Sequence, residues 1–171
     1  MVPSHLRAMT YALHTETVEF VVRDYRPADF DRLWRIDQIC FPPGIAYTQM
    51  DLTGFILRRK AITVVAEFPT GSEFAGGIAG FAVAQPIRNI GRILTLDIIP
   101  EARRLGLGAR LMQECEERLQ AGGCLQVFLE TAVNNEAAIR LYQKLGYEIL
   151  RTLPLYYPTH ALDGYLMGKG L

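Results

Sequence analysis

Apolar residues recur at two different spacings along the chain, and these spacings predict its elements. Strand-like runs, rich in β-branched and aromatic side chains, cover residues 18–25, 61–68, 78–85, 92–99, 124–132, 147–156 and 161–167. Helical spacing covers residues 27–40, 48–59, 105–121 and 135–145. The order is strand, two helices, three strands, helix, strand, helix and two strands. It predicts a mixed α/β (α+β) chain with one central sheet of about six to seven strands and about four helices.

Glycine and proline support these boundaries. The run from Phe41 through Pro42 and Pro43 to Gly44 cannot continue the first helix. Gly146 closes the last helix in the same way that a glycine pair closes the third. No repeat, linker or low-complexity block divides the chain. We therefore expect a single domain over residues 18–171, preceded by a flexible extension at residues 1–17.

Composition narrows the functional classes. Eighteen basic residues balance eighteen acidic ones, which argues against nucleic acid as a partner because phosphate binding usually requires a basic excess. The three cysteines lack CxxC spacing, and the three histidines are scattered, so no metal site is predicted. No apolar run is long enough to span a bilayer, and the N-terminus lacks a signal-peptide centre. These features predict a cytoplasmic protein with no membrane partner.

The segment at residues 96–109 has the composition of a phosphate-binding loop. A strand ends at Pro100, and a helix begins within a glycine-containing stretch that carries Arg103 and Arg104. Gly106 and Gly108 allow the backbone to approach a ligand closely, and the start of the helix favours an anion. The plainer alternative is a basic helix start with two incidental glycines. A P-loop and a dinucleotide fold are both excluded, because neither GxxxxGK[ST] nor a GxGxxG after the first strand is present.

A second cluster occupies residues 135–147. Asn135 stands where a helix begins and can cap it. Tyr142 follows seven positions later, two turns along the same face. Taken alone, these residues could be only an N-cap and a half-buried aromatic.

Both clusters together resemble a known family. The R-x-x-G-x-G pattern from Arg103 to Gly108 resembles the coenzyme A signature of the GNAT superfamily. The N-x-x-A-x-x-L-Y-x-K-x-G-[FY] run at residues 135–147 resembles its second signature. The resemblance implies a single domain whose sheet is splayed at the cofactor site, with acetyl-CoA as cofactor and no metal. It implies cofactor contacts from Ile98, Ile99, Arg103, Arg104, Leu105, Gly106, Leu107, Gly108, Ala109, Asn135, Ala138 and Tyr142.

The same resemblance implies direct attack of an amine on the thioester. Tyr142 would then protonate the departing thiolate. Glu130, which stands at the end of an apolar strand, is the candidate base that removes the amine proton. Asp97 on the cofactor strand is the competing base. Either carboxylate could instead have a structural role, Glu130 where the strand reaches solvent and Asp97 bonded to nearby backbone.

The acceptor is less clearly indicated. The C-terminal third resembles the protein N-terminal acetyltransferase branch, in which paired tyrosines hold the substrate backbone. Tyr156 and Tyr157 match that place, and Phe41-Pro42 matches the opposite wall. Two features depart from the ribosomal-protein alanine type. No tryptophan follows Phe-Pro, and Asp97 replaces a small residue, so its carboxylate could enter the acceptor site and bind a basic or amino-rich acceptor.

Three functions therefore remain open. The first is transfer of acetyl to a protein or peptide N-terminus. The second is acetylation of a small amine, such as a polyamine, an amino acid or an antibiotic. The third is a non-catalytic CoA-binding module. The chain could be a monomer or a homodimer.

Overall fold

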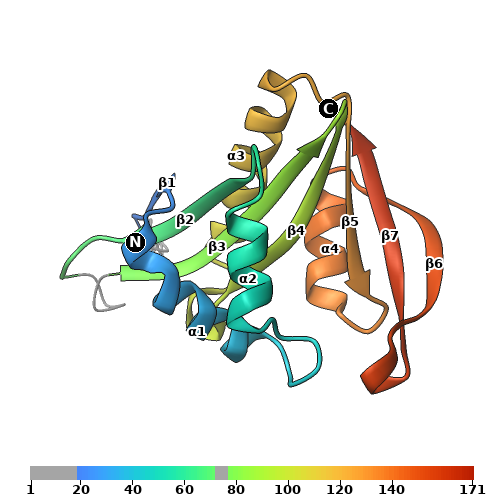
Figure 1. Ribbon diagram of the computed structural model, residues 1–171, viewed down its shortest axis with the longest axis horizontal. Coiled ribbons are helices and arrows are strands. Elements are labelled where there is room, and N and C mark those ends of the chain that lie inside the picture. The colour runs from blue at the N-terminus through green and yellow to red at the C-terminus, as the bar shows by residue number, and fades with distance from the viewer. Residues whose placement is uncertain (1–18, 72–76) are drawn as a thin grey trace, which may run out of the picture.

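The computed structural model describes residues 19–71 and 77–171, and the expected extension at residues 1–17 lies outside this part of the chain. Within it, one seven-stranded sheet has the order β1-β2-β3-β4-β5-β7-β6 (Figure 1). All neighbouring strands are antiparallel except β4 and β5, which are parallel. The strands are β1 Val21–Asp24, β2 Ile62–Phe68, β3 Gly77–Ile87, β4 Ile90–Ile98, β5 Gln126–Ala132, β6 Glu148–Tyr157 and β7 Leu162–Gly170.

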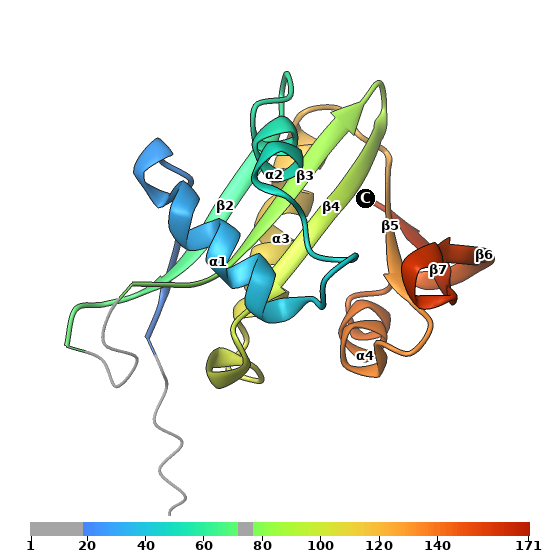
Figure 2. The same ribbon diagram turned by 60° about the horizontal axis from the view of Figure 1, so that its bottom comes forward.

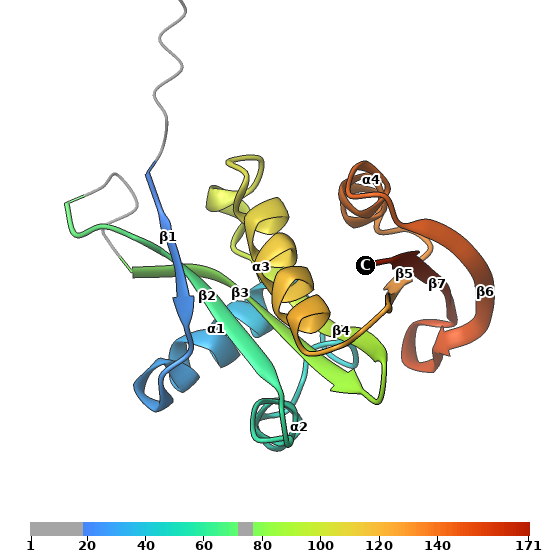
Figure 3. The same ribbon diagram turned by 90° about the horizontal axis from the view of Figure 1, so that it is seen from above.

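Helices cover both faces of the sheet. Helices α1 and α2 lie on one face, and α3 and α4 lie on the other (Figure 3). Their bounds are α1 Phe30–Cys40, α2 Gln49–Ile56, α3 Leu107–Ala121 and α4 Glu136–Lys144. The predicted fold class, a mixed sheet with about four helices, is confirmed.

The two faces bury separate apolar clusters. Leu33 and Ile36 of α1 pack with Leu52 of α2 and with Phe81 and Val83 of the sheet. On the other face, α3 buries the stripe predicted from its helical spacing: Leu107, Leu111, Met112, Cys115 and Leu119. Each such side chain, when fully buried, contributes about 1.5–3 kcal/mol from apolar burial. The helices are therefore fixed to the sheet from both sides, and the loops at their ends are held in place.

Strands β4 and β5 separate soon after they meet. Their pairing covers only Ile90–Arg92 against Gln126–Phe128, and residues 93–98 of β4 and 129–132 of β5 have no partner across this seam. A bulge accompanies the divergence, since Ala84 pairs with Ile93 while Val83 pairs with Thr95. Leu94 is the extra residue, and a bulge of this kind bends its strand. The strands diverge visibly in Figure 2, with α4 beside the wide end.

Three predicted helix boundaries were wrong by two residues or more. The first α-helix begins at Phe30 rather than at residue 27, because Pro27–Asp29 form a 3₁₀ turn. The second helix ends at Ile56 rather than at residue 59, and the following turn contains Lys60 at φ 63°. The third begins at Leu107 rather than at residue 105, because Arg104 and Gly106 have φ angles of 65° and 89°. Left-handed residues cannot continue a right-handed helix. The later start of the third helix therefore follows from backbone angles that apolar spacing does not report, whereas Lys60 stands beyond the predicted end of the second helix and does not account for its end at Ile56.

Candidate active site

The loop between β4 and α3, called the cradle below, has a backbone suited to binding an anion. After Ile98 the chain makes a short 3₁₀ turn at Pro100–Ala102 and then places Arg104 and Gly106 in left-handed conformations. Gly106 is the N-cap of α3 and has no side chain with which to cap it. The first amides of α3 are therefore available to an external acceptor, at the positive end of the helix dipole.

The surroundings of this cradle suit a pyrophosphate. The first turn of α3 contains no acidic residue, and Arg103 and Arg104 are exposed beside it. A Cβ added at Gly106 would meet no atom within 4 Å, so the space in front of the loop is open. A Cβ at Gly108 would lie 3.0 Å from Leu141 Cδ2, so this glycine allows α4 to approach α3 closely. The residues present therefore fit the phosphates of coenzyme A.

The end of β4 presents its backbone to the gap between residues 93–98 of β4 and residues 129–132 of β5, which we call the splay. Ile99 N–H donates to the Ala79 carbonyl at 2.9 Å, so the N–H of the preceding residue, Ile98, faces the opposite edge. The Ile98 carbonyl already accepts from Cys40 Sγ at 3.2 Å and from Arg103 Nε at 3.1 Å. The cofactor contact that the sequence predicts at Ile98 would therefore use the Ile98 N–H group.

Helix α4 forms the far wall of the splay. Asn135 Oδ1 accepts from the Ala138 N–H at 3.3 Å, so Asn135 caps the helix. Tyr142 is 7% exposed, and its ring lies 5.9 Å from that of Tyr147. Burial, followed by the charge of Asp97, raises the pKa of the Tyr142 phenol. The phenol therefore keeps its proton at neutral pH, as a proton donor must.

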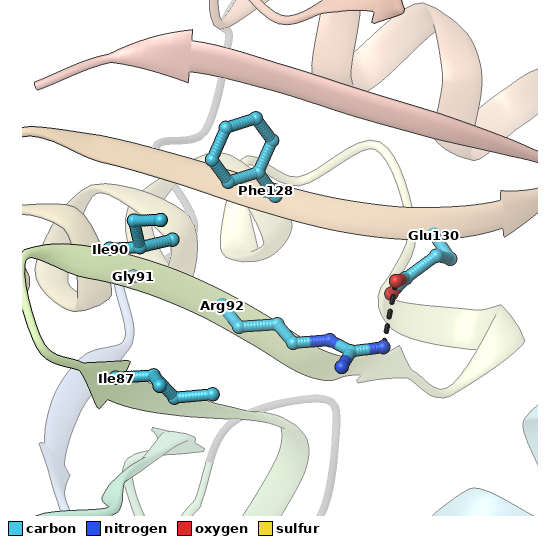
Figure 4. Close-up of a pocket in the computed structure, with 6 residues that line it drawn as sticks. All are labelled: Ile87, Ile90, Gly91, Arg92, Phe128 and Glu130. Atoms are coloured by element: carbon cyan, nitrogen blue, oxygen red, sulfur yellow. Dashed lines mark hydrogen bonds and ion pairs between the residues drawn. The ribbon is translucent and has the colours of Figure 1, made fainter. Parts of the chain in front are cut away.

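The predicted base, Glu130, lies across the splay from a partner that sequence reasoning missed. Arg92 Nη2 of β4 is 2.7 Å from Glu130 Oε1 of β5 (Figure 4). Their side chains are 42% and 17% exposed. Burial lowers the pKa of Arg92, but Glu130 and Tyr156 together raise it by more, so the guanidinium stays charged. Beside the pair is a shallow hollow of about 260 Å³, lined by Ile87, Ile90, Gly91, Arg92, Phe128 and Glu130.

The paired tyrosines complete this group of side chains. Arg92 also interacts with the Tyr156 side chain, and the Tyr156 and Tyr157 rings lie 5.0 Å apart at 85°. Burial, then Tyr156 and Glu130, raise the pKa of Tyr157 to about 12. Arg92 of β4, Glu130 of β5, and Tyr156 and Tyr157 at the end of β6 therefore form one group of electrostatically interacting side chains.

The loop carrying Phe41 and Pro42, the α1–α2 loop (residues 41–48), meets the β6–β7 loop (residues 158–161). His160 Nε2 lies 2.9 Å from the Pro43 carbonyl oxygen. A Cβ added at Gly44 would lie only 2.8 Å from Thr159 Cγ2, so the two loops are in close contact. Sequence reasoning assigned these loops to opposite walls but did not find this contact.

Residues 30–147 match the sequence profile described as the Acetyltransferase (GNAT) family. The chain belongs to this family. GNAT enzymes of this type are acyl-CoA-dependent N-acetyltransferases, which confirms the reaction class predicted from the two signatures. The matched residues include both the cradle and the divergent strands β4 and β5.

The GNAT chain is similar to protein acetyltransferases in particular. It is 27% identical to the N-alpha-acetyltransferase of Sulfurisphaera tokodaii over 95% of this chain and 100% of the relative. It is 32% identical to the [ribosomal protein bS18]-alanine N-acetyltransferase of Escherichia coli over 49% of this chain and 57% of that enzyme. The crystal structure of Ard1 from Thermoplasma volcanium superposes with a TM-score of 0.76 at 28% identity, covering 89% of this chain and 97% of Ard1. Other similar solved structures hold acetyl-CoA or CoA.

The GNAT site also contains a carboxylate that faces inward. Asp97, the competing base, is 1% exposed and accepts from Thr95 Oγ1 at 2.5 Å. Its neighbour across the helix–sheet interface is Asp37 of α1, which sequence reasoning missed. A signal was present, because Asp37 stands four residues after the buried Leu33 and therefore on the apolar face of α1.

Within the described ranges, no helix is long and apolar enough to cross a bilayer.

Proposed function

We propose that this GNAT enzyme transfers an acetyl group from acetyl-CoA to the N-terminal α-amine of a protein or peptide. The observation that carries the proposal is the contact of His160 and Thr159 with Pro43 and Gly44. An internal segment of an acceptor protein that lay across this side of the enzyme would have to separate the two loops before its amine could reach the base. A chain terminus can enter end-on and leave the contact intact. The names of the similar relatives point to the same acceptor class.

The cofactor would lie in the splay. The amides at the start of α3, with Arg103 and Arg104, would bind the pyrophosphate. The Ile98 N–H faces the gap where the pantetheine arm would run, and it could also donate to the oxygen that becomes negative during transfer. When bound, acetyl-CoA supplies an activated thioester. The protein's own task is then to orient the amine and to move two protons.

Glu130 is the proposed proton acceptor. An amine attacks only when it is neutral, so a base must take its proton directly or through water. Arg92 holds the Glu130 carboxylate across the splay at 2.7 Å and faces the same hollow. Because Arg92 is 42% exposed and also interacts with Tyr156, the ion pair can shift when an acceptor ammonium arrives. Glu130 is preferred to Asp97 because it is the more accessible carboxylate.

Tyr142 is the proposed proton donor. Its phenol remains protonated because burial raises its pKa, and α4 places it beside the splay. Tyr156 and Tyr157, with Phe41 and Pro42 on the other wall, would hold the first residues of the acceptor. The closeness of Tyr157 to both Tyr142 and Glu130 supports this arrangement.

Replacing Glu130 with glutamine is expected to lower kcat/KM for the acceptor by about 100-fold near neutral pH, the lower end of the usual contribution of a positioned base, because the base is lost. The deficit should shrink as the pH rises and the amine deprotonates on its own. The glutamine carbonyl can still accept from Arg92, so the fold should be retained. Steady-state rates from pH 6 to 10 would test this. The same deficit at every pH would contradict a base role.

The acceptor class is tested with a panel of short peptides that differ in their first residue, set beside polyamines, amino acids and aminoglycosides. Release of coenzyme A from acetyl-CoA is measured with each. We expect turnover with a subset of peptides and none with the same peptides carrying a blocked N-terminus. Peptides with a blocked N-terminus and a free internal lysine are the matched control for the end-on argument. Turnover with small amines alone would replace the proposal by the small-amine alternative.

A further inference from the structure

Two carboxyl groups lie buried against each other between α1 and β4. Asp37 is 0% exposed and Asp97 is 1% exposed. One oxygen of each is well bonded. Asp37 Oδ2 accepts from the Tyr47 N–H at 2.8 Å and from Gln38 Nε2 at 3.0 Å, and Asp97 Oδ1 accepts from Thr95 Oγ1 at 2.5 Å. The remaining oxygens, Asp37 Oδ1 and Asp97 Oδ2, are buried without a donor.

A proton on one of the two carboxyl groups would give a donor to a site that otherwise contains two unpaired acceptor oxygens. Each carboxyl perturbs the titration of the other, and two ionised carboxylates buried side by side would repel each other in a site that excludes water. A buried acceptor without a donor is also unfavourable by itself. One proton held between the groups removes both problems, because one carboxyl then donates to the other.

The titration tendencies of the groups agree with one shared proton. Burial raises the pKa of Asp97 well above its ordinary value and raises that of Asp37 to about 6. Between these values the pair carries one proton and one negative charge. The titratable groups that face the pair are Cys40 at the end of α1, Tyr47 in the α1–α2 loop and Tyr142 on α4, and burial raises the pKa of each. Each is therefore neutral near pH 8, and the Arg103 cation lies beside Cys40, since both donate to the Ile98 carbonyl oxygen.

The pair joins the acceptor wall to the cofactor strand. On one side, Asp37 binds the Tyr47 N–H, and the Tyr47 hydroxyl donates at 3.2 Å to the carbonyl of Leu94, the bulge residue of β4. On the other side, Asp97 immediately precedes Ile98, whose N–H faces the splay. A change in the separation of the two carboxyls would therefore move the α1–α2 loop relative to β4.

We propose that Asp37 and Asp97 share one proton and act as a positioning pair that fixes the acceptor wall, residues 41–47, to strand β4. The part of this proposal that concerns the acceptor rests on the proposed function, whereas the shared proton does not depend on it. It assigns Asp97 a structural part in the acceptor site, in place of direct contact with the amine or removal of its proton.

Asparagine at position 97 tests the shared proton. Its amide can donate to Asp37 Oδ1, and its carbonyl can accept from Thr95, so Asp97→Asn copies the protonated state. We expect Asp97→Asn to keep acceptor kcat/KM within about twofold of wild type. Asp97→Ala leaves the Asp37 charge unpaired, and we expect it to lower acceptor kcat/KM by about tenfold or more through a higher KM, with the Kd of acetyl-CoA within about twofold. Asp31→Asn, an exposed change on the same helix, is the matched control.

A substrate-free measurement separates this proposal from the proposed function. The infrared spectrum of the wild-type protein at pH 8 should contain the C=O stretch of a protonated carboxyl group. The band should disappear in Asp97→Asn and remain in Asp31→Asn. Absence of the band in the wild-type protein would overturn the shared proton. This result depends neither on the identity of the acceptor nor on whether Asp97→Ala folds.

The positioning role would be overturned if Asp97→Ala folded and kept an unchanged KM for the acceptor. It would also be overturned if Asp97→Asn were impaired as severely as Asp97→Ala. Failure of every peptide as an acceptor, with the band present, would count against the proposed function alone.

Discussion

Tyr142→Phe is expected to lower kcat by about 10²- to 10⁴-fold, which is the usual contribution of a positioned general acid. The change removes one hydroxyl and leaves the ring on α4, packed near Tyr147. Acetyl-CoA should therefore bind with nearly unchanged affinity, because only the proton donor is lost. Single-turnover rates combined with cofactor titration would measure the two effects separately.

Tyr147→Phe is the matched control for this prediction. It also removes the hydroxyl of a buried tyrosine, but that hydroxyl donates to Glu116 Oε1 at 2.8 Å on α3, away from the acceptor side. We expect it to lower the free energy of unfolding and to leave kcat close to wild type. If both variants slowed turnover equally, the loss in Tyr142→Phe would reflect packing and would not identify an acid.

Gly106→Val is expected to weaken acetyl-CoA binding about 100-fold. At φ 89°, a non-glycine residue costs about 1–2 kcal/mol of backbone strain. A β-branched side chain would also project into the open space before the cradle, where each lost hydrogen bond to a charged phosphate costs about 1.5–3 kcal/mol. Isothermal titration with CoA would measure the loss.

Gly123→Val separates strain from ligand contact in that experiment. Gly123 has φ 90°, also has open space around its Cβ position, and follows the opposite end of α3. Both variants should lose similar stability in denaturant unfolding, and only Gly106→Val should lose affinity for CoA. Equal affinities in the two variants would show that the loop at residues 103–108 does not hold the phosphates.

The parts of the site that sequence could predict are local. The cradle needs Arg103, Arg104 and Gly106 within a few residues of one another, so its composition is visible in one stretch of sequence. The cap at Asn135 and the position of Tyr142 likewise depend only on helical periodicity. The central sheet was predictable because each strand carries its own apolar run.

The unpredicted parts depend on contacts between distant segments. Arg92 and Glu130 are 38 positions apart, and Pro43 and His160 are 117 apart. Their meeting follows from the register of β4 against β5 and from the paths of two loops, neither of which apolar spacing reports. The bulge at Leu94 is similar, because it is defined by the partner strand rather than by its own sequence. Asp37 lies between these cases, since its place on the buried face of α1 was readable and its partner was not.

The narrow seam between β4 and β5 divides the sheet into two mechanical halves. Three residue pairs join the N-terminal strands to the unit made of β5, α4, β7 and β6, and beyond them the edges separate. A ligand held by α3 on one side and by α4 on the other would act as a cross-link between these halves. Cofactor affinity and the rigidity of the C-terminal unit would then be coupled, so a substitution that loosens the seam would weaken binding without touching the ligand.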